Sequence, residues 1–216
     1  MRFLHNSFGF GLFLLTAACG GSGAPTQPLL PQPAIGWAIT EGSGIGQQPN
    51  GMILPIVPLA APMFALPQCA SASTCWISYV EYASGPIVGG NLVLDYTIAG
   101  SNPVFVNDSP GNTCQPPNPA ISLLIHQRGD TGLWNWGRIF SAQRSPLALG
   151  SAALKVPLVD SAWIGVDGTI APGQVALQMV QAQSIGFVLG GGCFAGHGVA
   201  VSSGSALLTI NGLSTQ

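Results

Sequence analysis

Alternation of apolar and polar side chains predicts that most of this chain is β-strand. In residues 91–99 (NLVLDYTIA), every second side chain from Leu92 to Ile98 is apolar or aromatic. A period of two residues is typical of a strand that buries one face. Similar strands are predicted at residues 75–82, 120–127, 133–141, 153–159, 185–189, 198–201 and 206–210. Because Gly, Pro, Asn and Ser separate these strands, we expect an all-β fold, a sandwich or a barrel.

One segment departs from this pattern toward a helix. Residues 172–183 (PGQVALQMVQAQ) are rich in the helix formers Gln, Ala, Leu and Met. Val175, Met179 and Ala182 would share one face of that helix. Strand alternation fits the same residues almost as well. We expect a short helix near residues 173–183.

Two other segments are assigned from their turn-forming residues. Residues 50–67 are apolar but hold prolines at positions 55, 58, 62 and 67, which exclude a helix and a central strand. We expect an extended segment along the sandwich or at its edge. Residues 202–205 (SSGS) are expected to form a hairpin loop between the last two strands.

The N-terminal residues predict export. Arg2 is followed by an apolar run at residues 8–15, which is too short to span a bilayer, and then by small residues before Cys19. This order is typical of a secretion signal, here residues 1–18. The flanking small residues resemble the lipobox of bacterial lipoproteins, which implies that Cys19 becomes the lipidated first residue. Thr16 stands where the lipobox usually has leucine, so simple secretion is the alternative and an uncleaved anchor the third.

A tether and one domain are expected after the signal. Residues 19–34 hold four prolines and no charge, the composition of a flexible or semi-rigid spacer. An ordinary disordered N-terminus has the same composition. No repeat or second composition block follows, so residues 35–216 are expected to form one β-sandwich domain. The expected location is the bacterial cell envelope, with a lipid anchor in the outer membrane favoured, or a secreted or periplasmic location without the lipid.

The remaining cysteines are even in number, which suits disulfides. Setting Cys19 aside leaves four, and exported chains permit oxidation. Cys69 with Cys75 is the favoured pair because five intervening residues close a small loop, which leaves Cys114 with Cys193. A four-thiolate zinc site is the alternative. Such sites usually have two close cysteine pairs, and this chain has one.

Composition removes several classes of function. The chain has 5 basic and 7 acidic residues among 216, so charged residues are 6% where about 25% is usual. We expect no nucleic-acid partner, because so few cations cannot neutralise a phosphate backbone. Hydrophobic residues are 47%, which excludes a disordered chain. No apolar run reaches the length of a membrane span.

The order of several segments resembles a known group of proteins. The segments are GNLVLDYTIAG, WNWGRIF, LKVPLV with Trp163 shortly after it, and SIGFVLGGGCFAGHGVAV. They resemble uncharacterised bacterial exported proteins, whose layout is similar to the jelly-roll sandwiches of carbohydrate-binding modules. The resemblance covers residues 75–210, and its most specific piece is GGGCFAGHG. It implies a jelly-roll-like antiparallel β-sandwich, with sugar binding only as an analogy.

Candidate catalytic groups are few. The chain lacks a Gly-x-Ser-x-Gly elbow, a His-Glu-x-x-His motif, a P-loop and a dinucleotide motif, so we expect no enzyme activity and no metal or other cofactor. His126 and His197 could act as a base or a ligand, although structural roles are favoured for both. Glu81, Asp95 and Asp130 could form a glycosidase pair if the fold brought two of them to the required separation.

A tryptophan pair is the better candidate for binding. Trp134, Trp136 and Arg138 lie two residues apart along a predicted strand and would share one face. The rings could stack on sugar rings while Arg138, Asp130 and Asn135 bond hydroxyl groups. The alternative is that this face belongs to the core.

We expect a non-catalytic envelope lipoprotein that binds a neutral ligand, with a glycan or polysaccharide favoured. The alternative is a structural or adhesion lipoprotein that contacts another envelope protein, and the third function is a glycosidase-type hydrolase. Exposure of Trp134 and Trp136 beside a groove would favour sugar, and their burial would favour a protein partner. The isolated Trp76 and Trp163 are expected in the core.

Overall fold

The computed structural model describes residues 37–43, 62–69, 76–107, 119–129, 137–165, 173–190 and 198–216. These residues form an all-β fold, as predicted, with one α-helix and one short 3-10 helix among them. The strands are β1 (Trp37–Ser43), β2 (Met63–Ala65), β3 (Trp76–Ala83), β4 (Asn91–Asn107), β5 (Ala120–Gln127), β6 (Arg138–Ser141), β7 (Ser145–Pro146), β8 (Gly150–Pro157), β9 (Trp163–Ile164), β10 (Ala182–Gly190) and β11 (Val199–Thr215). The helices are η2 (Asp160–Ala162) and α1 (Gln174–Gln181).

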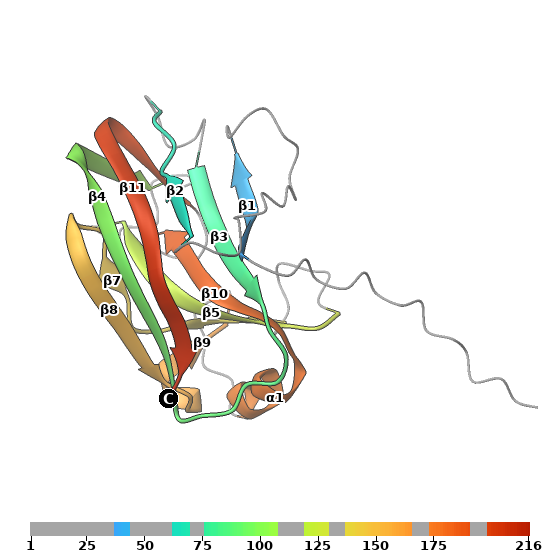
Figure 1. Ribbon diagram of the computed structural model, residues 1–216. Helices are drawn as coiled ribbons and strands as arrows, with labels where there is room; N and C mark the ends of the chain where they lie inside the picture. The colour runs from blue at the N-terminus through green and yellow to red at the C-terminus, as the bar shows by residue number, and fades with distance from the viewer. Residues whose placement is uncertain are drawn as a thin grey trace, which may run out of the picture. The chain divides into compact units, whose positions relative to one another are not determined.

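All the strands join one antiparallel sheet, which curls back on itself. The order is β8-β4-β11-β3-β10-β5-β6-β9, with β1 beside β3, β2 beside β11 and β7 beside β5 (Figure 1). Tyr96 of β4 and Ser145 of β7 nevertheless share a hydrogen bond of 2.7 Å between their hydroxyl groups. Because β7 pairs with β5, four places from β4 in this order, the bond requires the sheet to curl. Burial inside the curl raises the pKa of Tyr96 above its ordinary value of 10.0, although the bond to Ser145 opposes this shift.

Strand β5 is buried on both faces, because its apolar run AISLLIHQ leaves few polar positions. Ile121, Leu123 and Ile125 enter the main core, which also takes side chains from β3, β4, β10 and β11. Leu124, on the opposite face, packs into a smaller apolar group. We call this group the second cluster; its members are Tyr79, Leu124, Phe140 and Val188. The sheet is therefore covered on both sides at β5.

The predicted hairpin loop at residues 202–205 is wrong. Those residues lie within a single strand, β11, and both halves of β11 pair with β4 rather than with each other. Shifts of register near residues 201–205 let the strand continue through them. Gly204 has φ +75°, and a Cβ there would lie 2.2 Å from the Ser101 carbonyl oxygen. The glycine that indicated a turn instead lets the two strands approach closely.

The helix predicted near residues 173–183 is confirmed as α1. Its N-terminal N–H groups are satisfied by a residue far back in the chain. Asp160 of η2 accepts hydrogen bonds from the backbone N–H of Gly173 through Oδ2 and of Val175 through Oδ1, the second at 3.2 Å. A carboxylate at this end also complements the helix dipole. One acidic side chain thereby fixes α1 against η2.

Trp163 is buried, as expected, and its indole N–H donates to the Pro157 carbonyl at 2.8 Å. Cys69 is buried and disulfide-bonded. Every other cysteine lies outside the described residues. Residues 1–36 and the side chain of Trp76 lie outside them as well. Of residues 50–67, the described part contains β2, a three-residue strand beside β11. No helix in the described part of the chain is long and apolar enough to cross a membrane.

Replacement of Gly204 by alanine should destabilise the fold by about 2 to 5 kcal/mol, since positive φ costs about 1 to 2 kcal/mol and overpacking about 1 to 3 kcal/mol more. Gly129→Ala is the matched control, because Gly129 has φ +78° and a Cβ there would have no atom within 4 Å. Gly129→Ala should lose only the cost of positive φ, about 1 to 2 kcal/mol. Urea unfolding of both variants measures the difference, and equal losses would contradict the close approach of β4 and β11.

Candidate functional site

Arg138 is the one predicted ligand-binding residue within the described part of the chain; Asp130, Trp134, Asn135 and Trp136 lie outside it. Arg138 begins β6, and its guanidinium carbon lies 5.0 Å from the centre of the Tyr79 ring. That distance is typical of a cation-π contact. Phe140 also packs on Tyr79, with 6.1 Å between ring centres. Arg138 and Phe140, which stand two residues apart on β6, therefore share a sheet face.

The pairing of the strands brings three polar residues to this same face. His126 of β5 is opposite Ser184 of β10 on one side and opposite Arg138 of β6 on the other. Glu81 of β3 is opposite Gly186 of β10, two residues further along that strand. Residues directly or diagonally opposite on one face are close enough for their side chains to interact. We call Glu81, His126, Ser184 and Arg138 the polar cluster.

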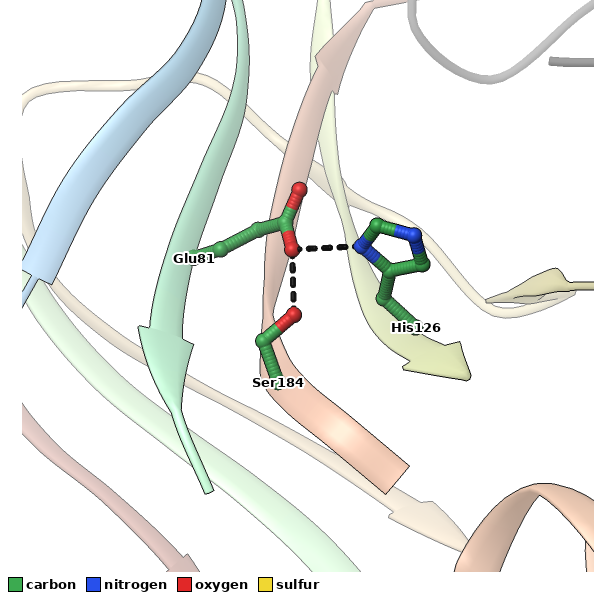
Figure 2. Close-up of polar contacts among 3 residues, drawn as sticks. All are labelled: Glu81, His126 and Ser184. Atoms are coloured by element: carbon green, nitrogen blue, oxygen red, sulfur yellow. Dashed lines mark hydrogen bonds and ion pairs between the residues drawn. The ribbon is translucent and has the colours of Figure 1, made fainter. Parts of the chain in front are cut away.

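Glu81 joins His126 and Ser184 through a single oxygen (Figure 2). Its Oε2 lies 2.9 Å from Nδ1 of His126 and also accepts a hydrogen bond from the hydroxyl group of Ser184. An ionised carboxylate can only accept, so with Glu81 in that form Nδ1 is the nitrogen of His126 that donates. Glu81, His126 and Ser184 are 5%, 7% and 5% exposed, respectively. Hydrogen bonding of this kind offsets part of the cost of removing a carboxylate from water.

Gly186 makes room for this arrangement. A side chain at position 186 would stand between Glu81 and Leu124, which is opposite Gly186 on β5. The strands approach so closely here that a Cβ on Gly186 would lie 2.1 Å from the Val80 carbonyl oxygen. The glycine thus leaves the space over β10 to the carboxylate of Glu81. This is why Glu81 can reach across to Ser184 and His126.

The order of the three groups decides what chemistry they can perform. In a serine hydrolase the histidine stands between the serine and the acid, and takes the serine proton. Here Glu81 stands between Ser184 and His126, and the Ser184 hydroxyl donates to the carboxylate. The Glu81 carboxylate holds the side chains of His126 and Ser184 in fixed positions. Such an arrangement suits a structural or orienting role. It does not pair Ser184 with a base in the way nucleophilic catalysis requires.

The other acidic candidates do not join this site. Asp95 is exposed on β4, whereas Glu81 is buried on β3, with β11 between the two strands. The structure therefore does not bring Glu81 and Asp95 together as a glycosidase pair. Asp130 and His197 lie outside the described residues. Within the described residues, no group of three or more His, Cys, Asp and Glu side chains could hold a metal ion.

Sequence reasoning identified Glu81 and His126 as polar candidates but missed Ser184, Gly186 and Tyr79. The predicted strand at residues 185–189 began after Ser184, and nothing in the sequence indicated its partner strands. The structure shows that β10 begins at Ala182 and pairs with both β3 and β5. The polar cluster depends on these non-local pairings, so no local pattern could reveal it.

Replacement of Glu81 by alanine should lower the unfolding free energy by about 2 to 4 kcal/mol, because it leaves buried donors on His126 and Ser184 without their acceptor. The matched control is Asp95→Ala, which removes an exposed carboxylate and should change stability by no more than about 0.5 kcal/mol. Urea unfolding of the two variants provides the comparison. A loss no larger for Glu81→Ala than for Asp95→Ala would mean that the cluster adds nothing to the fold.

No protein-family model, no curated protein and no solved structure matches the chain. Function is therefore inferred from the described residues and from the sequence itself.

Proposed function

We propose that the protein is a non-catalytic domain of the bacterial cell envelope that binds a neutral ligand, with a carbohydrate as the favoured class. The observation that carries the proposal is the position of Arg138. This residue begins β6 on the sheet face that holds the polar cluster, with its guanidinium over the ring of Tyr79. A cation held in this way presents fixed donors, which suits the recognition of hydroxyl groups.

The surroundings of Arg138 favour a ligand without net charge. The polar cluster holds one basic side chain, Arg138, and one acidic side chain, Glu81, on the same sheet face. Trp136 and Trp134 stand two and four residues before Arg138 in the chain, and Asp130 and Asn135 belong to the same segment. Indole rings offer flat apolar surfaces for sugar rings, while Asp and Asn side chains bond hydroxyl groups. These residues are proposed as the binding surface together with Arg138.

A jelly-roll-like β-sandwich is the proposed architecture. The curled antiparallel sheet and the disulfide at Cys69 support it. The proposed pairs are Cys69 with Cys75 and Cys114 with Cys193, which would join distant parts of the chain. The similarity to carbohydrate-binding modules noted from the sequence segments is an analogy of fold, and fold does not by itself assign a function.

Lipid anchoring is the second part of the proposal. Residues 1–18 are proposed as the signal peptide, Cys19 as the lipidated residue and residues 19–34 as the tether of a domain that begins at residue 35. The short apolar run before small residues and a cysteine supports it. The outer membrane is the proposed location.

Glycan binding should depend on the tryptophan pair. On a glycan array, Trp134→Ala/Trp136→Ala and, separately, Arg138→Gln should each weaken binding at least roughly tenfold, because stacking and fixed donors are lost. Arg144→Gln is the matched control, since Arg144 is also half-buried but follows β6 and lies outside the polar cluster. Absence of any glycan ligand, or equal binding by all variants, would remove the sugar-binding proposal.

Membrane association should depend on Cys19. A Cys19→Ser variant should leave the membrane fraction, because lipidation requires the cysteine thiol. Fractionation with sodium carbonate extraction measures the change, with mass spectrometry of the mature N-terminus as the check on processing. Full retention of an unlipidated Cys19→Ser protein in the carbonate-washed membranes would count against a lipid anchor.

A further inference from the structure

Exposed aliphatic side chains gather at the end of the molecule that carries α1. Their exposed fractions are 82% for Val88, 70% for Val180, 51% for Val159 and 41% for Leu177. We call these four residues the apolar end. Leu177 and Val180 are three residues apart and so share one face of α1. Single exposed apolar residues are ordinary on a soluble protein, but a group of them marks an interaction site.

Backbone hydrogen bonds hold the parts of the apolar end together. In the connection from β3 to β4, the Ile87 N–H donates to the Met179 carbonyl of α1 at 2.8 Å. At the end of the same connection, the Gly90 carbonyl accepts from Leu158 at 2.9 Å. Figure 1 shows this connection running past α1 toward the start of β4. Three segments distant in sequence therefore form one surface.

The exposure of Val88 follows from the burial of its neighbour. Ile87 is only 7% exposed and belongs to the main core. Because Ile87 is held inward and its N–H is bonded to α1, Val88 extends into solvent. The backbone on either side of Val88 is therefore held in place, and its side chain stays exposed.

Charge is almost absent from this end. Residues 84–90 and 173–183 contain no charged side chain. Asp160, between Val159 and α1, directs both carboxylate oxygens to the N–H groups at the start of α1. Arg128 lies at the other end of the helix, exposed, with its N–H bonded to the Gln181 carbonyl at 2.8 Å. Among the described residues, the exposed charged side chain beside the apolar end is therefore a cation.

We propose that the apolar end inserts into the surface of a lipid bilayer, with Arg128 beside anionic headgroups. A stable protein interface needs about 800 Å² per partner and aromatic or arginine anchors at its centre. The apolar end offers instead four small aliphatic side chains on a turn, an eight-residue helix and a short connection. Insertion into lipid needs no shape complementarity; it requires exposed apolar side chains and favours cations over carboxylates at the rim. This contact does not depend on lipidation of Cys19 or on sugar binding.

Binding to vesicles tests the proposal in the full chain carrying Cys19→Ser, which removes the lipid anchor. Co-sedimentation is measured with phosphatidylcholine vesicles, with and without an equal amount of phosphatidylglycerol. Val88→Ser/Val180→Ser should weaken binding at least roughly tenfold, since two apolar side chains no longer leave water. The matched control is Met63→Ser/Leu207→Ser, which changes two exposed apolar residues on β2 and β11 and should bind as before. Arg128→Gln should weaken binding only to the anionic vesicles.

A second measurement detects insertion into the bilayer at Val88 directly. An environment-sensitive fluorophore on Val88→Cys should shift to shorter wavelength when vesicles are added, whereas the same label on Met63→Cys should not. Equal shifts at both positions, or no shift at Val88, would overturn the proposal. So would equal loss of vesicle binding in the two serine double variants. A dimer in solution that Val88→Ser/Val180→Ser dissociates would overturn it in favour of a second copy of this chain.

Discussion

The pairing of β4 with β11 is the interaction on which the rest of the structure depends. Both strands are seventeen residues long, and their register runs from Val199 opposite Asn107 to Thr215 opposite Leu92. β8 continues the sheet beyond β4, and β3 continues it beyond β11. A ladder this long cannot stay flat, because strands twist and its bulges add further bending. The resulting curl closes an apolar interior around side chains that are far apart in sequence.

Burial of β5 and β10 on both faces explains why a polar cluster is found away from solvent. The inner faces of these strands enter the main core, and their outer faces adjoin the second cluster. A carboxylate placed there needs partners. Glu81 of β3 finds them in Ser184 on the neighbouring strand β10 and in His126 on β5, the strand beyond β10. Arg138 lies one strand further on, so the proposed ligand surface and the buried cluster share one sheet face. Ligand recognition and fold stability would then depend on adjacent residues of the same sheet face.

The fold was predictable where the signal is local. β5 has the predicted bounds because apolar side chains dominate its sequence, and α1 forms where helix formers coincide with helical spacing. The continuation of β11 through residues 202–205 was not predictable in this way, since Ser and Gly favour both turns and bulges. Only the partner strand, β4, decides between the two. The same limit applies to the candidate site: His126 was visible as a polar residue in an apolar strand, but its contact with Glu81 was not.

The sequence by itself determined the fold class, the short helix and the scarcity of charge, because side-chain period and composition are properties of neighbouring residues. Tertiary structure alone decided that Ser184 faces Glu81, that Asp160 caps α1 from another segment, and that Val88 and Val180 share one end. Each of these contacts joins strands, helices or connections whose relative placement follows from the register of the whole sheet. A register is set by the burial of many side chains at once, and no single segment of sequence contains it.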